Sequence, residues 1–158
     1  PRLYLPRWTE QIMAEVSRNL RENFGLSREQ AAYREGEIRR HFPEAWIEGY
    51  EDLIPSMTND EKDRHVLAAA VYSQSKLIVT YNGQDFPRTA LAPYSISVQG
   101  PSAFLENLCH LDQNAVVQTL KEQAAAIGRP VDYVLDRLRI NAPHFVDMIA
   151  AEGLRSQQ

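Results

Sequence analysis

The stretch DRHVLAAAVYSQSKLIVTYNGQDFP, residues 63–87, decides the fold class. Its first half has apolar residues at helical spacing. The face that we expect to be buried consists of Val66, Leu67, Ala70 and Val71. Residues 77–81, LIVTY, are continuously apolar or β-branched, which predicts a parallel strand covered on both faces. Asn82-Gly83 then turns the chain at the carboxyl end of this strand.

The flanking sequence extends this helix-strand pattern in both directions. Upstream, Thr9 is a helix N-cap, and Ser27 with Gln30 forms the capping box of a second helix that ends near Pro43. Residues 46–50 predict a short strand. Downstream, residues 96–98 predict another strand, and Pro101 stands at the first position of a further helix. The alternation of strands and helices indicates an α/β protein.

The sequence after Cys109 is helical throughout. Asp112 opens a helix that Gly128 closes, and two shorter amphipathic helices follow Pro130. We therefore expect a first domain over residues 1–109 and a C-terminal helical extension over residues 110–158. The tail GLRSQQ, residues 153–158, is expected to fray.

Composition limits the class of protein. The chain has 158 residues, 44% of them hydrophobic and 24% charged, with a net charge of −4. This length suits one domain with a core and a small appendage. The single cysteine excludes an internal disulfide framework and favours a reducing, cytoplasmic location. No apolar stretch is long enough to cross a membrane. The mildly acidic balance argues against bulk nucleic-acid binding.

Carboxylates are the remaining candidates for chemistry, because the sequence has no Gly-rich phosphate loop, no Cys/His metal spacing and no serine elbow. Asp63 begins the apolar helix, and Asp85 lies beyond the carboxyl end of the predicted strand, where ligands bind in open α/β sheets. Glu15 flanks the apolar stripe of the first helix. If these three side chains converge, their mutual repulsion calls for a hard cation, and oxygen ligands suit Mg²⁺ or Mn²⁺.

Each carboxylate also has an ordinary structural interpretation. Asp63 is well placed to be a plain N-cap, and Asp85 to stabilise a turn. Glu15 can be a solvated residue paired with Arg18. The spacing alone does not separate these interpretations from a metal site.

Three blocks of sequence resemble the bacterial PIN-domain ribonucleases of the VapC toxin type. Residues 63–87 are similar to a family core in which a D-x-H-x-x-A-A-A helix leads into a strand ending T-x-N-x-x-D-F. RWTEQIMAEVSRNL, residues 7–20, resembles the upstream helix with its conserved acid, and SISVQGPSAFLENL, residues 95–108, resembles the closing strand and helix. The resemblance implies a PIN-like three-layer α/β fold, with a short parallel sheet flanked by helices, plus the C-terminal helical extension.

The resemblance also implies a site and a function. Glu15, Asp63 and Asp85 match three of the four acidic positions that bind Mg²⁺ or Mn²⁺ in this family, and Thr80 and Asn82 match polar residues that order the site. The implied activity is hydrolysis of RNA phosphodiesters by metal-activated water. The implied partner is a cognate antitoxin, commonly bound to a homodimer. The basic side chains near the expected cleft, candidates for RNA binding, are Arg7, Lys62, Arg64 and Arg88, with Arg64 also expected to form a local salt bridge beside Asp63.

One departure from the family pattern changes the expectation. Family members begin with a strand that carries the first metal ligand, whereas this sequence starts at Pro1 in the loop before the RWTEQI helix. We therefore expect a chain without the family's first strand and helix: a fragment of a longer product, a protein whose missing strand another segment supplies, or a decayed family member. It would pair with the missing N-terminal segment or form a homodimer, and the loss of one metal ligand would leave it inactive in this form. One alternative is a non-catalytic module that binds an antitoxin or partner chain. Another is DNA binding by the helical tail, which its few basic residues disfavour.

Overall fold

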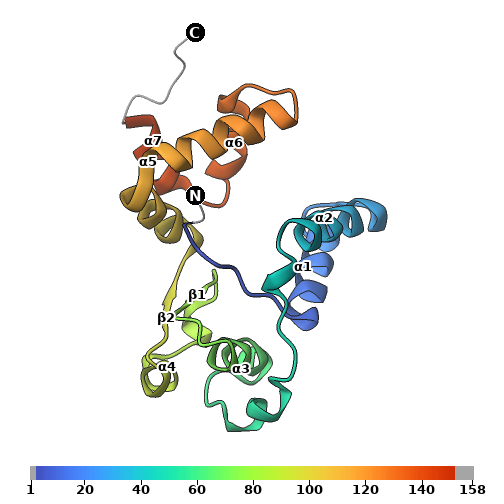
Figure 1. Cartoon of the computed structure of the whole chain (residues 1–158), viewed down its shortest axis with the longest axis vertical. Coiled ribbons are helices and arrows are strands. Elements are labelled where there is room, and N and C mark those ends of the chain that lie inside the picture. Colours follow the sequence, from blue (N-terminus) through green and yellow to red (C-terminus); the bar gives the residue numbers. More distant parts are fainter. Residues whose placement is uncertain (1–2, 152–158) are drawn as a thin grey trace. The chain divides into compact units, whose positions relative to one another are not determined.

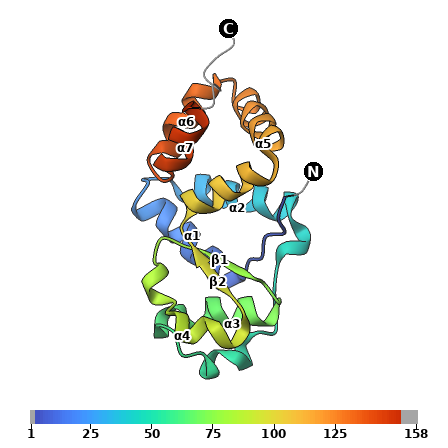
Figure 2. The same ribbon diagram turned by 90° about the vertical axis from the view of Figure 1, so that its left-hand side faces the viewer.

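The computed structural model describes residues 3–151 as seven α-helices, two β-strands and several short 3₁₀ helices (Figures 1 and 2). The helices and strands are α1 (Glu10–Glu22), α2 (Arg28–His41), α3 (Arg64–Tyr72), β1 (Leu77–Val79), α4 (Arg88–Leu91), β2 (Ser97–Gln99), α5 (Pro101–Ala126), α6 (Val131–Arg139) and α7 (Pro143–Ala151). The tail expected to fray, residues 153–158, lies outside the described residues.

The chain forms two compact units. The N-terminal unit comprises residues 4–78 and 84–97, and the C-terminal unit comprises residue 3, residues 79–83 and the described chain from residue 98 onward. The division runs through the two strands rather than between residues 109 and 110, which lie inside α5. The domain boundary expected after Cys109 stays a prediction.

The helix ends follow the local signals in the sequence. The Thr9 hydroxyl accepts a hydrogen bond from the Ile12 amide at 3.1 Å, so it caps α1. Ser27 and Gln30 form both bonds of the capping box of α2. Pro101 stands in the first turn of α5, and Gly128 follows its end with a φ of +61°. These expectations are confirmed because each depends on a few neighbouring residues.

The expected strand at residues 46–50 is wrong. In the described chain this segment makes only an isolated parallel bridge, between Trp46 and Trp8, and a 3₁₀ helix, η2 (Glu51–Ser56), follows it. Gly49 has a φ of +80°, a left-handed conformation that ends the extended run. Arg39 of α2 lies 3.6 Å from the centre of the Trp46 ring and forms an ion pair with Glu10 of α1, so the bridge is enclosed by both helices.

The two strands pair in parallel, as expected of an α/β protein. The Ser97 amide donates to the Lys76 carbonyl at 3.0 Å, and the Thr80 amide donates to the Gln99 carbonyl at 2.9 Å. The expectation of a strand from 77 to 81 covered on both faces is wrong. β1 ends at Val79, whose side chain is 41% exposed, and Tyr81 is 67% exposed. The Tyr81 hydroxyl donates to the Asn141 carbonyl, which keeps the phenol at the surface.

The core of the N-terminal unit centres on α3, which packs against η2. Its buried face is broader than the sequence predicted, because consecutive alanines allow close approach on several sides. That face consists of His65, Leu67, Ala68, Ala69 and Ala70. The expected core positions Val66 and Val71 are only half-buried, so this part of the prediction is wrong.

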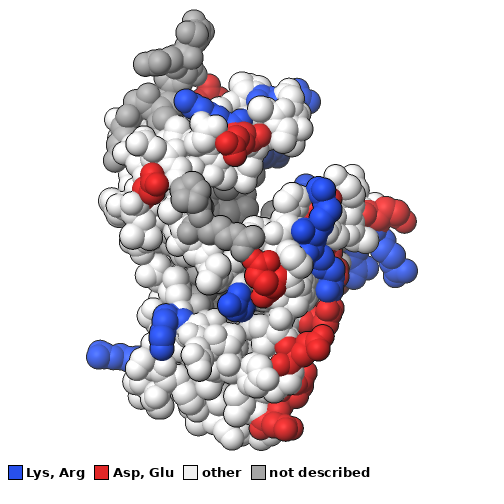
Figure 3. Space-filling view, viewed as in Figure 1, with Lys and Arg blue, Asp and Glu red and all other residues white. Residues whose placement is uncertain are grey.

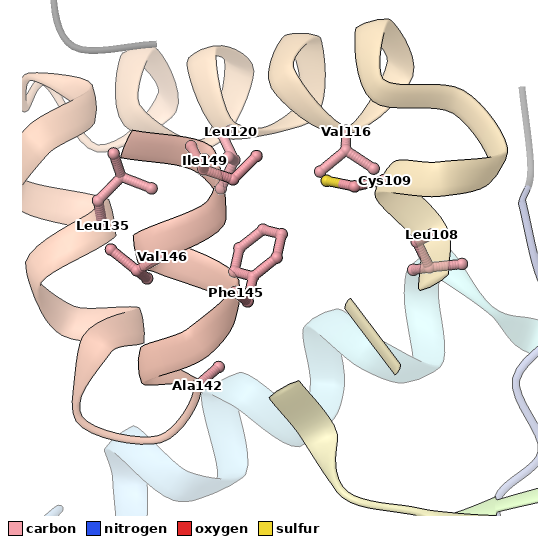
Figure 4. Packing of buried hydrophobic residues seen from close by; sticks show 9 residues of the cluster. All are labelled: Leu108, Cys109, Val116, Leu120, Leu135, Ala142, Phe145, Val146 and Ile149. Atoms are coloured by element: carbon pink, nitrogen blue, oxygen red, sulfur yellow. The ribbon is translucent and has the colours of Figure 1, made fainter. Parts of the chain in front are cut away.

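The C-terminal unit has its own core among α5, α6 and α7. Asp112 breaks the helical geometry of α5, and its carboxylate accepts from the Ala115 amide at 2.9 Å, as expected for a residue that opens a helix. Figure 4 shows Phe145 at the centre of the apolar cluster. The other cluster members are Leu108, Cys109, Val116, Leu120, Leu135, Ala142, Val146 and Ile149. None of the described helices is long and apolar enough to cross a membrane.

Candidate functional site

Asp63 stands at the N-cap position of α3 without acting as a cap. Its carboxylate makes no capping hydrogen bond within the described structure. Instead, Asp60 caps the preceding 3₁₀ helix, η3 (Glu61–Asp63), by accepting from the Lys62 amide at 3.2 Å. The side chain of Asp63 is 18% exposed, and its Oδ2 atom is buried. The plain N-cap interpretation of Asp63 therefore fails, and its carboxylate is available for another contact.

Asp85 approaches Asp63 from a different segment. It ends the 3₁₀ helix η4 (Gly83–Asp85), and its carbonyl accepts from the Asp60 amide at 3.1 Å. This backbone bond fixes Asp85 beside η3, so two carboxylates 22 residues apart in the sequence lie together in the N-terminal unit. The side chain of Asp85 is only 12% exposed. Asp85 is therefore more than a turn residue.

Lys62 supplies the positive charge nearest to this acidic pair. Its Nζ atom lies 3.1 Å from Asp85 Oδ2 and 3.9 Å from Asp63 Oδ2. Burial raises the pKa of the Asp63 carboxyl, the neighbouring Asp85 carboxylate raises it further, and Lys62 partly opposes them. The contact with Asp85 raises the pKa of the Lys62 amine. The pair is thus a partly buried anionic site held beside a single ammonium group.

The donor atoms of the pair fit a hard divalent cation. Asp63 Oδ2 and Asp85 Oδ2 are both buried, and neither has a hydrogen-bond partner in the described part of the chain. The Lys62 contact is an ion pair without hydrogen-bond geometry. Mg²⁺ is commonly bound by one or two carboxylates while it keeps several waters, so two aspartates are sufficient protein ligands. Among residues 3–151, however, no three acidic, histidine or cysteine side chains are close enough to share an ion.

The structure places Glu15 against a histidine. Its Oε1 atom lies 3.1 Å from Nε2 of His65, which is 3% exposed at the start of α3. Glu15 itself is 41% exposed and projects from α1. His65 is two residues beyond Asp63, so the contact joins α1 to the first turn of α3, which follows Asp63. The pairing of Glu15 with Arg18 is replaced by this contact, and the role of Glu15 as a metal ligand stays a prediction.

Thr80 and Asn82 form a local turn in the C-terminal unit. The Asn82 amide donates to the Thr80 hydroxyl at 3.1 Å, directly after β1. This bond orders the segment that leads toward η4. The assignment of these two residues to the ordering of a metal site stays a prediction.

The expected RNA-binding residues make different local contacts. Arg7 donates to the Pro6 carbonyl, and Arg88 is exposed at the start of α4. The salt bridge expected of Arg64 is absent among the described residues, because its Nε atom donates to the Asn59 carbonyl at 3.4 Å. Lys62 is 66% exposed, so it reaches both the carboxylates and solvent.

Acidic side chains gather along the edge of the N-terminal unit formed by the segment between α2 and α3 (Figure 3). They include Glu44, Glu48, Glu51 and Asp52, all exposed. The negative charge of this edge repels phosphate.

Three residues near the pair have features that the sequence does not predict. The sequence makes Lys62 a candidate for RNA binding, and in the structure it is the counter-charge of Asp85. His65 belongs to the D-x-H pattern in the sequence, and in the structure it contacts Glu15. Asn59 is 4% exposed, and its side-chain amide has no hydrogen-bond partner within residues 3–151. No signal in the sequence marks Asn59, because its burial depends on tertiary packing.

Comparison with known proteins finds a sequence relative that is named as a ribonuclease. The chain is 48% identical over 104 residues to a Mycobacterium tuberculosis protein named "Putative ribonuclease VapC50". The match covers 64% of this chain and 62% of that relative. No family model matches the chain, and no solved structure matches it. The similarity supports the resemblance to VapC-type ribonucleases, while the PIN-like layering of the fold stays a prediction.

Proposed function

We propose that this chain is a Mg²⁺- or Mn²⁺-dependent endoribonuclease of the VapC type that hydrolyses RNA phosphodiesters. The observation that carries the proposal is the Asp63–Asp85 pair, with two buried carboxylate oxygens that lack hydrogen-bond partners in the described structure. The identity of 48% to a protein named as a ribonuclease supports RNA as the substrate class.

The residues of the pair have distinct tasks in this proposal. Asp63 and Asp85 would hold the cation through their buried Oδ2 atoms. The resemblance adds Glu15 as a third ligand, but in this structure Glu15 contacts His65 instead. When bound, a divalent cation neutralises charge on the phosphodiester and lowers the pKa of water for in-line attack. Because the pKa of Asp63 is raised, this carboxyl must lose its proton before it can bind a cation, so the affinity for metal falls as the pH falls.

The resemblance extends the proposal to partners. A cognate antitoxin would hold the ribonuclease inactive in the cytoplasm, and the active form would commonly be a homodimer. Thr80 and Asn82 would order the approach to the site. The exposed cations Lys62 and Arg88 would contact RNA phosphate, together with Arg7 and Arg64 once these leave their backbone partners.

Cleavage of a mixed RNA substrate tests this function directly. The wild-type chain is assayed with Mn²⁺ and with EDTA, beside Asp63→Asn and Asp85→Asn. Asp52→Asn is the matched control, since it removes an exposed aspartate of η2. We expect cleavage by the wild type and the control only when Mn²⁺ is present, and a loss of at least 100-fold in both site variants. Equal cleavage in EDTA, or full activity of Asp63→Asn, would show that the metal mechanism is wrong.

A non-catalytic binding module is the second candidate. It is favoured by an apolar groove of about 380 Å³ between α1 and α2 in the N-terminal unit. The groove is lined by Val16, Leu20, Tyr33, Arg34, Glu37 and Ile38. Tyr33 is 70% exposed at this groove, so its ring is accessible to a partner chain. Light scattering after size exclusion, with and without an antitoxin peptide, tests this candidate: a monomer that retains no peptide contradicts it.

A further inference from the structure

Lys62 occupies a position that a cation would take beside the acidic pair. We infer that its ammonium group is a built-in competitor, which must leave Asp85 before a divalent cation can bind and which therefore weakens the metal affinity of the site. This inference rests on the proposed function, because it concerns the same two carboxylates. It makes the Lys62 ammonium group a determinant of metal affinity in addition to the two aspartates.

The contacts of Lys62 are made with the same atoms that would bind the metal. Its Nζ atom is 3.1 Å from Asp85 Oδ2 and 3.9 Å from Asp63 Oδ2. These two oxygens are the buried ones that lack hydrogen-bond partners in the part of the chain described. A cation bound between them would lie within a few ångströms of the ammonium. Two positive charges cannot both occupy this position without strong repulsion.

The lysine can leave without disturbing the pair. Its side chain is 66% exposed, so the ammonium can move into solvent without breaking any core packing. Its backbone amide is held by Asp60 Oδ1, and the Asp60 amide is held by the Asp85 carbonyl. These backbone contacts do not involve the ammonium group. The carboxylates therefore keep their places when Lys62 swings away, and the exchange of lysine for metal requires only a side-chain rotation.

The neighbouring charges leave Lys62 as the single candidate for this role. The Arg64 guanidinium is directed to the Asn59 carbonyl, and no described ion pair joins it to either aspartate. His65, the next titratable side chain of α3, contacts Glu15 instead. In a titration with metal and no RNA, removal of the Lys62 charge should therefore act on metal binding alone. The ion pair between Lys62 and Asp85 is exposed on the lysine side and therefore weak. Its loss should tighten the binding of a divalent cation by only about 3- to 10-fold.

Titration with Mn²⁺ alone, followed by calorimetry, tests the inference on the full chain. Lys62→Met removes the charge and keeps the length of the side chain, and Lys62→Arg retains the charge. Lys76→Met is the matched control, since Lys76 is exposed and makes no ion pair among the described residues. A fourth protein, Asp63→Asn, reports whether the acidic pair is the Mn²⁺ site. Far-UV circular dichroism confirms that each variant is folded.

The inference and the proposed function fail in different ways. We expect Lys62→Met to bind Mn²⁺ about 3- to 10-fold more tightly than the wild type, while Lys62→Arg and Lys76→Met bind like the wild type. An unchanged or weaker affinity in Lys62→Met would overturn the role of Lys62 and leave the metal site standing. If neither the wild type nor Lys62→Met binds Mn²⁺, or if Asp63→Asn binds it as well as the wild type, the proposed site itself is wrong.

Discussion

Replacement of Phe145 by alanine should strongly destabilise the C-terminal unit and spare the N-terminal one. Phe145 is 1% exposed at the centre of the apolar cluster among α5, α6 and α7 (Figure 4). Its amide donates to the Ser102 hydroxyl at 3.0 Å, a backbone contact that alanine retains. The substitution therefore removes packing alone. Truncation of a buried phenylalanine costs about 3–5 kcal/mol, a large part of the 5–15 kcal/mol that stabilises a typical domain.

The positions of the two tryptophans make the prediction measurable. Trp8 and Trp46 both lie in the N-terminal unit, and the sequence has no other tryptophan. In a urea titration, tryptophan fluorescence therefore follows the N-terminal unit, whereas far-UV circular dichroism follows the helices of both units. We expect Phe145→Ala to lower the midpoint of a dichroism transition by about 1 M or more, because a loss of about 3–5 kcal/mol is divided by a slope of about 1–3 kcal/mol per M for small domains. The fluorescence midpoint should stay unchanged.

A surface aromatic provides the control. Tyr133 of α6 is 38% exposed, so Tyr133→Ala should shift both midpoints only slightly. If Phe145→Ala shifts the fluorescence midpoint as far as the dichroism midpoint, the two units unfold as one cooperative body. The division of the chain into two units with separate cores would then be refuted.

Two further predictions concern the acidic site. Burial raises the pKa of Asp63 above its value in the unfolded chain, so in EDTA the stability contributed by this carboxyl is greatest at acid pH and is lost as the pH rises through the raised pKa. Asp63→Asn should lack this loss and show a Tm higher by a few degrees at neutral pH. A lower Tm for Asp63→Asn at neutral pH would contradict this. Glu15→Gln should weaken Mn²⁺ binding less than 10-fold, since Glu15 contacts His65 rather than the pair. A loss as large as that of Asp63→Asn would instead make Glu15 a ligand, as its sequence position predicts.

The sequence predicted those features that depend on neighbouring residues. The caps at Thr9 and Ser27 and the helix start at Asp112 involve bonds across three residues, so local chemistry determines them. The prediction of a strand at residues 46–50 is wrong because Gly49 takes a left-handed conformation, which the apolar pattern of these residues does not indicate. The prediction that β1 is buried on both faces is wrong for a different reason. An apolar run shows that a strand can be covered on both faces, but it does not show which elements cover it.

The candidate site was predicted only in part, for the same physical reason. That Asp63 and Asp85 meet follows from the expectation that ligands bind beyond the carboxyl end of a parallel strand. The bond from the Asp60 amide to the Asp85 carbonyl, which brings them together, joins two loops distant in sequence. The contact of Glu15 with His65 joins two helices. Such pairings depend on tertiary packing, so residue spacing does not reveal them.

The start of α3 shows why Asp63 does not act as a helix cap. Sequence statistics favour aspartate at an N-cap, where its oxygen accepts a backbone amide. In this chain a 3₁₀ turn precedes the helix, and Asp60 takes the capping bond of that turn. The Asp63 carboxylate is thereby released from the backbone and turned toward Asp85, at the cost of a raised pKa. A buried, uncapped carboxylate beside a second carboxylate lowers stability, because the two charges repel each other. Asparagine at position 63 would avoid this repulsion, and the proposed divalent cation would offset it.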